Sequence, residues 1–200
     1  MLPVRVEKRG IRALGIAESF RVGLLKRSCL AGVVMRADLV VDGFVFGSAT
    51  IGGDDATDAV IGMFYRLERN DINVIILRGV IISFFNIIDL EKVYFDTNVP
   101  VIGLTFEESE GLDEHIKHHF PQNWQHKIQQ YHKVGERKKL KLKTGSTLFI
   151  RAVGLDEKQA TQILNRFTLQ GAIPEPVRVA HLLAHTKYQW DMEYFRLDSQ

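Results

Sequence analysis

Residues 39–77 read LVVDGFVFGSATIGGDDATDAVIGMFYRLERNDINVIIL, and the spacing of apolar residues changes twice along this stretch. Residues 39–51 are rich in Val and Phe and are bounded by turn-forming residues, which indicates a strand. After Asp55, apolar residues recur at positions 60, 63, 64 and 67, the spacing of one helix face. Residues 73–77 form a short continuous apolar run, typical of a strand buried on both faces of a parallel sheet. The stretch therefore predicts a strand, a helix and a buried strand in succession.

The regions on either side complete an α/β pattern. Short links join apolar runs at 11–17 and 29–36 to the strand at 39–51, which predicts a three-strand antiparallel meander. Further along, the spacing predicts a helix at 86–95, a strand at 101–104, polar helical structure at 109–135, a strand at 146–153 and two closing helices. Alternating strands and helices imply parallel strands joined by right-handed crossovers, so we expect a mixed sheet with helices on both faces. Several α/β arrangements share this order.

Length and composition limit the class of protein. The chain has 200 residues, of which 46% are hydrophobic and 25% charged, as in an ordinary globular protein and unlike a disordered one. We expect one domain over residues 1–200, with a loosely ordered tail at 189–200. Cys29 is the only cysteine, so an internal disulfide and a Cys-based zinc cluster are excluded, and we interpret it as inert core. A reducing, cytoplasmic setting follows as an expectation.

No membrane partner is expected. The amino-terminal sequence lacks an apolar run followed by a small-residue cleavage site, so we predict no signal peptide. The most apolar segment, residues 72–90, contains Arg78, Asn86 and Asp89, each costly in hydrocarbon. A buried strand and turn explain this segment better than a membrane span.

Positive charge is concentrated in two places, although the formal net charge is only +2. One is residues 1–36, and the other is the run RKKLKLK at 137–143. Separated basic patches are typical of a polyanion-binding face, and solvated surface charge is the plain alternative. Lys138, Lys139 and Lys141 belong either to a strand with one exposed face or to an edge that follows the phosphates of a nucleic acid.

Five short stretches resemble an archaeal family of uncharacterised proteins related to endonuclease V, some of which are described as endonuclease dU. They are LGIAESF at 14–20, AGVVMR at 31–36, IGGDDATD at 51–58, LRGVIISFFNIID at 77–89 and GAIPEPVRVAH at 171–181. The last stretch also resembles the closing motif of endonuclease V itself. The resemblance implies a ribonuclease H-like fold and hydrolysis of a phosphodiester bond with Mg²⁺ or Mn²⁺ held by convergent carboxylates.

The resemblance also implies a substrate and a set of site residues. The expected substrate is DNA, or alternatively RNA, cut beside a deaminated base (uracil or hypoxanthine) that is extruded into a pocket, as in DNA repair. The residues so assigned are Glu18, Asp54 and Asp55 as metal ligands and catalytic groups, His181 as a further catalytic group, and Arg78, Arg178, Lys138, Lys139 and Lys141 as nucleic-acid contacts.

Two acidic positions depart from the endonuclease V pattern. Ala17 stands where the first aspartate is expected, and Arg78 stands where the acid after the fourth strand is expected. A protein of the same fold that binds nucleic acid without cutting it is therefore the alternative hypothesis. Arg78 is expected either to pair with one of the remaining acids, as a substitute for a cation, or to bind a backbone phosphate.

The residue types alone also leave structural alternatives open. Asp55, with Asp58 three residues later, is typical of a helix cap. Arg178, His181 and His185 share one helix stripe, which is either exposed to solvent or faces a substrate. The histidines at positions 115, 118 and 119 are interpreted as an exposed polar helix rather than a metal site.

Overall fold

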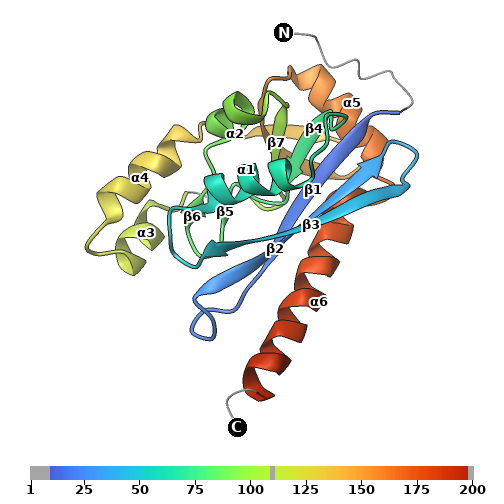
Figure 1. The fold of residues 1–200 in the computed structure, drawn as a ribbon. Helices are drawn as coiled ribbons and strands as arrows, with labels where there is room; N and C mark the ends of the chain where they lie inside the picture. The colour runs from blue at the N-terminus through green and yellow to red at the C-terminus, as the bar shows by residue number, and fades with distance from the viewer. Residues whose placement is uncertain (1–9, 109–110, 198–200) are drawn as a thin grey trace.

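A seven-stranded mixed sheet forms the centre of the protein in a computed structural model that describes residues 10–108 and 111–197 (Figure 1). Its strands, in spatial order, are β3 (Val41–Thr50), β2 (Arg27–Arg36), β1 (Arg12–Ser19), β4 (Val74–Leu77), β7 (Val101–Thr105), β9 (Thr147–Val153) and β8 (Lys138–Lys141). β1, β2 and β3 pair antiparallel, so the predicted meander is confirmed. β4 pairs parallel with both β1 and β7, whereas β9 and β8 run antiparallel to their neighbours.

Helices cover both faces of the sheet. They are α1 (Ala56–Arg66), α2 (Leu90–Thr97), α3 (Asp113–His119), α4 (Trp124–Lys133), α5 (Glu157–Phe167) and α6 (Glu175–Leu197). β4 shows how the core divides: Ile75 and Leu77 belong to the cluster under α1 and α2, whereas Ile76 belongs to the cluster under α5 and the start of α6. All four β4 residues are buried, as the continuous apolar run predicted. Burying one such side chain stabilises the fold by about 1.5–3 kcal/mol.

The close contact between α6 and β1 is possible because residue 15 is glycine. A Cβ atom at Gly15 would lie 2.4 Å from the carbonyl carbon of Pro176, which no folded protein accommodates. The first turn of α6 therefore lies directly on β1, and the helix continues across β1 and β2 (Figure 1). This contact fixes the direction in which the next turns of α6 present their side chains.

Three boundaries differ from the sequence-based expectation. The helix predicted from residue 86 begins at Leu90, because Asn86 and Ile87 form β6, which pairs with β5 (Ile81–Ile82). The polar helical region predicted at 109–135 consists of α3 and α4, interrupted at Phe120 and Pro121. α6 continues to Leu197, so the tail expected to be loosely ordered from residue 189 is helical over its described part.

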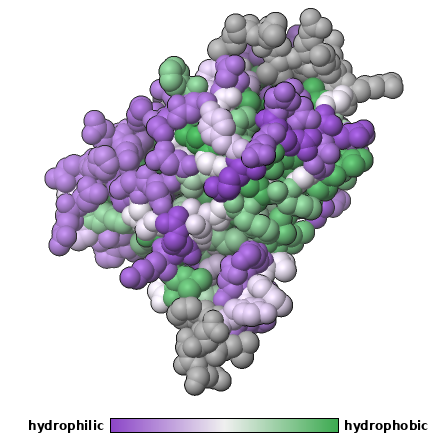
Figure 2. Space-filling view, in the orientation of Figure 1, coloured by the Kyte–Doolittle hydropathy of each residue, from purple (hydrophilic) through white to green (hydrophobic). Residues whose placement is uncertain are grey.

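The surface is divided by character. In Figure 2, hydrophilic residues gather over α3 and α4, and hydrophobic residues are exposed over the edge strand β3. Phe44 and Phe46 on β3 are 55% and 41% exposed. None of the described helices combines the length and the apolar character that crossing a membrane requires.

Candidate functional site

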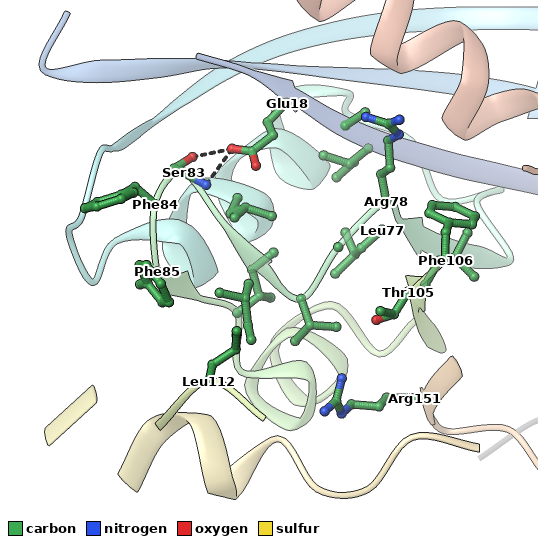
Figure 3. Close-up of a pocket in the computed structure, with 18 of the residues that line it drawn as sticks. Glu18, Leu77, Arg78, Ser83, Phe84, Phe85, Thr105, Phe106, Leu112 and Arg151 are labelled. Carbon is green, nitrogen blue, oxygen red and sulfur yellow. Dashed lines mark hydrogen bonds between the residues drawn. The ribbon is translucent and has the colours of Figure 1, made fainter. Parts of the chain in front are cut away.

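A pocket of about 540 Å³ opens where β1, β4 and β7 end, at the edge where the carboxyl ends of parallel strands meet. Ligands in open α/β sheets bind at this edge. The pocket walls are mostly apolar and include Leu77, Ile82 and Leu104. Charged groups interrupt the apolar wall, with Glu18 and Arg78 on one side and Arg151 on the other (Figure 3), and the lining also includes Glu107 and Arg137.

The two oxygens of the Glu18 carboxylate have different surroundings. Oε2 accepts hydrogen bonds from the main-chain N–H and from the hydroxyl of Ser83, both at 2.6 Å. No hydrogen bond or ion pair from the described residues reaches Oε1, and Figure 3 shows this oxygen turned toward the pocket. Burial raises the pKa of Glu18, while the bonds from Ser83 and the charge of Arg78 act to lower it. The pocket thus contains a carboxylate with one satisfied oxygen and one open oxygen.

Ser83 begins a turn that is unusual in its backbone. Ser83, Phe84 and Phe85 have φ values of 46°, 60° and 63°, in the left-handed region that residues other than glycine seldom adopt. Such strain persists only where surrounding contacts hold it, and it is common at functional sites. Glu18 supplies two of those contacts, and the N–H of Gly52 supplies another by donating to the Ser83 carbonyl at 2.7 Å. The rings of Phe84 and Phe85 pack against His119.

Arg78 links the end of β4 to α6. Its Nη1 lies 2.9 Å from Nδ1 of His181, and because a guanidinium only donates hydrogen bonds, the imidazole is the acceptor. Burial and the charge of Arg78 lower the pKa of His181, although a main-chain contact with Glu18 opposes them. Within the described chain, the buried Nε of Arg78 has no hydrogen-bond partner. Arg78 and His181 are therefore brought together beside Glu18.

Asp54 lies in a different environment, bonded to a buried lysine. Lys127 of α4 has a side chain that is 1% exposed, and its ammonium donates to the Asp54 carboxylate and to the carbonyls of Gly53 and Phe85, each at 3.0 Å. The same ammonium lies 4.7 Å from the ring centre of Phe120. Lys127 therefore ties α4 to the start of α1 and to the strained turn.

Asp55 is also fully engaged by neighbouring groups. Its carboxylate accepts from the N–H and hydroxyl of Thr50, both at 2.8 Å, and from the side-chain amide of Asn86 at 2.7 Å, with Arg27 3.3 Å away. Burial acts to raise the pKa of Asp55, but these hydrogen bonds outweigh it and the pKa is lowered. Asp55 occupies the cap position of α1, as predicted, but its side chain accepts no hydrogen bond from the first turn of the helix. The predicted capping hydrogen bond is therefore wrong. Asn86 instead accepts the first N–H of the helix, from Ala56.

The three acids predicted to bind metal do not converge. Glu18 binds the Ser83 turn, Asp54 binds Lys127, and Asp55 binds Thr50 and Asn86. Over residues 10–108 and 111–197, no group of three or more His, Cys, Asp or Glu side chains is placed to hold a metal ion. Lys127 forms an ion pair with Asp54, and Arg27 forms one with Asp55. The donor set therefore does not fit a two-metal centre, which requires several carboxylates around shared ions.

Apart from Arg78, which lines the pocket, the predicted nucleic-acid contacts lie outside it. Arg178 is exposed and paired with Glu175, its Nη2 lying 2.6 Å from the carboxylate. The basic run forms β8, an edge strand in which Leu140 is buried and Lys138, Lys139 and Lys141 are exposed. The strand with one exposed face is thus confirmed, and binding to phosphates stays a prediction.

The remaining residues singled out from the sequence lie outside the pocket. The histidines at 115, 118 and 119 lie exposed on α3, as expected of a polar helix. Cys29 is buried on β2, and burial raises its pKa to about 11, which suits an inert thiol.

Comparison with known proteins connects this geometry to a family. Residues 9–187 match the family described as Endonuclease dU. A UPF0215 protein of Pyrobaculum calidifontis is 37% identical over 174 residues, which cover 86% of this chain and 93% of that protein. A solved structure of a protein of unknown function from Archaeoglobus fulgidus has a TM-score of 0.75 and 28% identity, covering 88% of this chain and 97% of that one.

The fold also matches a protein solved in complex with DNA. Ciona intestinalis endonuclease V, in complex with a DNA containing an inosine, has a TM-score of 0.58 at 14% identity and covers 90% of this chain and 87% of that chain. At this identity the likeness shows the fold alone, and it confirms the ribonuclease H-like architecture. Together with the match over nearly the whole length, these findings show that the chain belongs to the endonuclease dU family.

Proposed function

We propose that this protein is an endonuclease that acts on DNA containing a deaminated base, uracil or hypoxanthine. The pocket beside Glu18 and Arg78 carries the proposal. Its volume of about 540 Å³ lies in the range of small-molecule sites, roughly 300–1,000 Å³. Apolar walls with a few polar groups suit a flat base removed from the helix. The chain's family supports phosphodiester cleavage as the reaction.

Entry of a base into this pocket requires that the nucleotide leave the base stack. Extrusion costs a few kcal/mol and costs least where pairing is already weakened, as it is for a deaminated base opposite its original partner. The exposed lysines of β8 and Arg178 are the proposed phosphate contacts, and such contacts hold the backbone without reading sequence.

Arg78 and His181 are the proposed groups at the scissile phosphate. Arg78 carries a fixed positive charge in the pocket lining, which suits a phosphate oxygen or the charge that develops on it. The lowered pKa of His181 favours the neutral imidazole, the form that accepts a proton. Mg²⁺ or Mn²⁺ was expected at Glu18, Asp54 and Asp55, but these residues do not fit a shared ion, so no step is assigned to a metal.

The second candidate function is nucleic-acid binding without cleavage. Two observations favour it: Ala17 and Arg78 stand at positions where the fold's nucleases use acids, and Lys127 neutralises Asp54. This alternative predicts binding that weakens steeply with salt and is unaffected by chelator.

A cleavage assay tests the proposal. Purified protein is incubated with end-labelled single-stranded and duplex DNA carrying one uracil or one hypoxanthine, with matched RNA in parallel, in Mg²⁺, in Mn²⁺ and in chelator. Nicking near the modified base, absent from unmodified DNA, is the expected result. Retained binding without nicking in every condition would overturn the proposal in favour of the non-cleaving protein.

A further inference from the structure

The asymmetry of the Glu18 carboxylate suggests a role for its open oxygen. Oε2 is fixed by two short hydrogen bonds from Ser83, so the carboxylate cannot rotate freely. Oε1 is thereby held in one direction, toward a pocket whose walls are mostly apolar (Figure 3). A ligand that fills the pocket and covers Oε1 has to donate a hydrogen bond to it, because leaving a buried polar group unpaired costs about 1–3 kcal/mol.

Deamination creates a donor at one defined position of a base. N3 of cytosine is a hydrogen-bond acceptor, and in uracil the same atom carries a proton and donates. N1 of adenine likewise accepts, and N1 of hypoxanthine donates. An ionised carboxylate has no proton to donate and can only accept. It therefore attracts the two deaminated bases and repels the two bases from which they arise.

We propose that Oε1 of Glu18 accepts the N3–H of uracil or the N1–H of hypoxanthine and is the residue that distinguishes deaminated bases from cytosine and adenine. This inference rests on the proposed function and names the specificity determinant of the same site. It gives Glu18 a different task from the metal ligation that its position in the sequence implies.

Two neighbours support the carboxylate in this task. Burial raises the pKa of Glu18, and the guanidinium of Arg78 opposes this effect by favouring the ionised form, in which the side chain only accepts. The Ser83 hydroxyl, which is completely buried, also lies 2.6 Å from the hydroxyl of Ser28 on β2. Glu18 is therefore anchored through Ser83 to the sheet, and a residue held this firmly discriminates by geometry as well as by charge.

Thymine and guanine also carry a proton at these positions, so Glu18 alone does not exclude them. In intact duplex DNA they are correctly paired, and extruding a paired base costs more than extruding a mispaired one. The inference therefore divides selection into two parts. Weak pairing admits a base to the pocket, and Glu18 rejects cytosine and adenine once they enter.

The test compares binding of single-stranded DNA, in which no base pair has to be broken. Fluorescence anisotropy in chelator measures the affinity for labelled 15-mers that differ only in one central uracil or cytosine and otherwise contain only adenine and cytosine, because unpaired thymine or guanine would also offer a donor. For the unaltered protein we expect affinity for uracil at least about tenfold above that for cytosine, since a site built to bind a donor rejects an analogue that lacks it.

Glu18→Gln separates recognition from anchoring. The glutamine oxygen still accepts from Ser83, which leaves the amide NH₂ pointing into the pocket, where it donates to N3 of cytosine. We expect the uracil preference to fall by about tenfold or to reverse, while the affinity for the cytosine 15-mer does not fall. Glu114→Gln makes the same chemical change on exposed α3 and is expected to keep the preference.

The outcomes separate the inference from the function on which it rests. If the unaltered protein cuts uracil DNA but Glu18→Gln keeps the uracil preference, the inference is wrong and the proposed function stands. If Glu18→Gln abolishes cleavage with the binding preference unchanged, Glu18 acts at the reacting centre and the inference is again wrong. Failure of the unaltered protein to cut uracil or hypoxanthine DNA overturns the proposed function itself.

Discussion

Two groups of acids lie near the same end of the sheet and behave differently. Asp54 is paired through one oxygen with the buried Lys127, and Asp55 accepts hydrogen bonds from Thr50 and Asn86. Glu18 keeps one oxygen turned toward a pocket. Carboxylates that look equivalent in the sequence thus divide into a pair that holds the structure together and one that is open to a ligand. The partners separate the two groups: Asp54 and Asp55 bind side chains of other elements, whereas Glu18 binds the Ser83 turn and directs its second oxygen toward the pocket.

The largest expected effect on stability comes from removing Lys127, the buried cation that pairs with Asp54; Asp54 and Asp55 are called the closed group below. Lys127→Met deletes an ammonium that satisfies the Asp54 carboxylate and two carbonyls. Breaking a buried ion pair from one side costs about 3–5 kcal/mol, and because Asp54 remains partly exposed we expect about 3 kcal/mol. The midpoint of urea unfolding measures this loss.

Lys133→Met on the same helix is the control. Lys133 also pairs with an aspartate, Asp89, but its side chain is 62% exposed, and such pairs contribute about 0–1 kcal/mol. Equal losses of stability for the two variants would show that Lys127 is not the anchor described above.

Asp55→Asn is the next largest change and tests whether the closed group takes part in recognition. Asparagine cannot accept all the hydrogen bonds from Thr50 and Asn86, so we expect a loss of about 1–2 kcal/mol in the free energy of unfolding. Base discrimination by the folded variant is expected to stay unchanged. A selective loss of uracil binding in the anisotropy assay would instead place Asp55 in the site.

The pH dependence of stability sharpens the comparison for Glu18. Its pKa is raised in the folded protein, so the folded state binds the proton more tightly than the unfolded chain does. This contribution to stability is complete below the unfolded pKa near 4.5 and is lost as the pH rises through the folded pKa. Glutamine does not ionise, so Glu18→Gln avoids this loss of stability at high pH. The variant is expected to have a higher melting temperature than the unaltered protein at pH 8. Thermal unfolding between pH 4 and 8 checks this, and parallel curves would show that Glu18 is not desolvated.

His181 gives the smallest expected effect, with the opposite sign. Its pKa is lowered on folding, so stability from the neutral ring is present above the unfolded value near 6.5 and is lost as the pH falls through the folded pKa. His181→Gln is expected to flatten that part of the curve slightly. An unchanged slope between pH 5 and 7 would mean that the ring titrates as it does in water.

Much of the fold follows from the spacing of apolar residues. The meander strands, the buried strand β4 and the helix α1 each keep one kind of apolar pattern over their whole length. Their predicted positions therefore agree with the observed ones. Asn86 was assigned to a helix because its neighbours are apolar, and a side chain bonded to residues 30 or more positions away leaves no local signal.

The site was less accessible from the sequence. The resemblance brought Glu18, Arg78 and His181 into one place, and the structure agrees with that grouping. Lys127 was missed although it shares a helix stripe with Trp124, Ile128 and Tyr131, because a lysine on such a stripe usually keeps its ammonium in solvent. The strained Ser83 turn lies within an apolar run whose pattern does not distinguish a turn from a strand.

One substitution on the base tests the central claim most directly. Replacing the proton on N3 of uracil by a methyl group removes the donor that Oε1 of Glu18 is proposed to accept and leaves the phosphates, the sugar and the apolar ring in place. We predict that a single-stranded 15-mer with one N3-methyluracil binds the unaltered protein at least about tenfold more weakly than its uracil counterpart. We predict that Glu18→Gln binds the two oligonucleotides with equal affinity. Equal affinity of the unaltered protein for the two oligonucleotides would contradict recognition by Glu18.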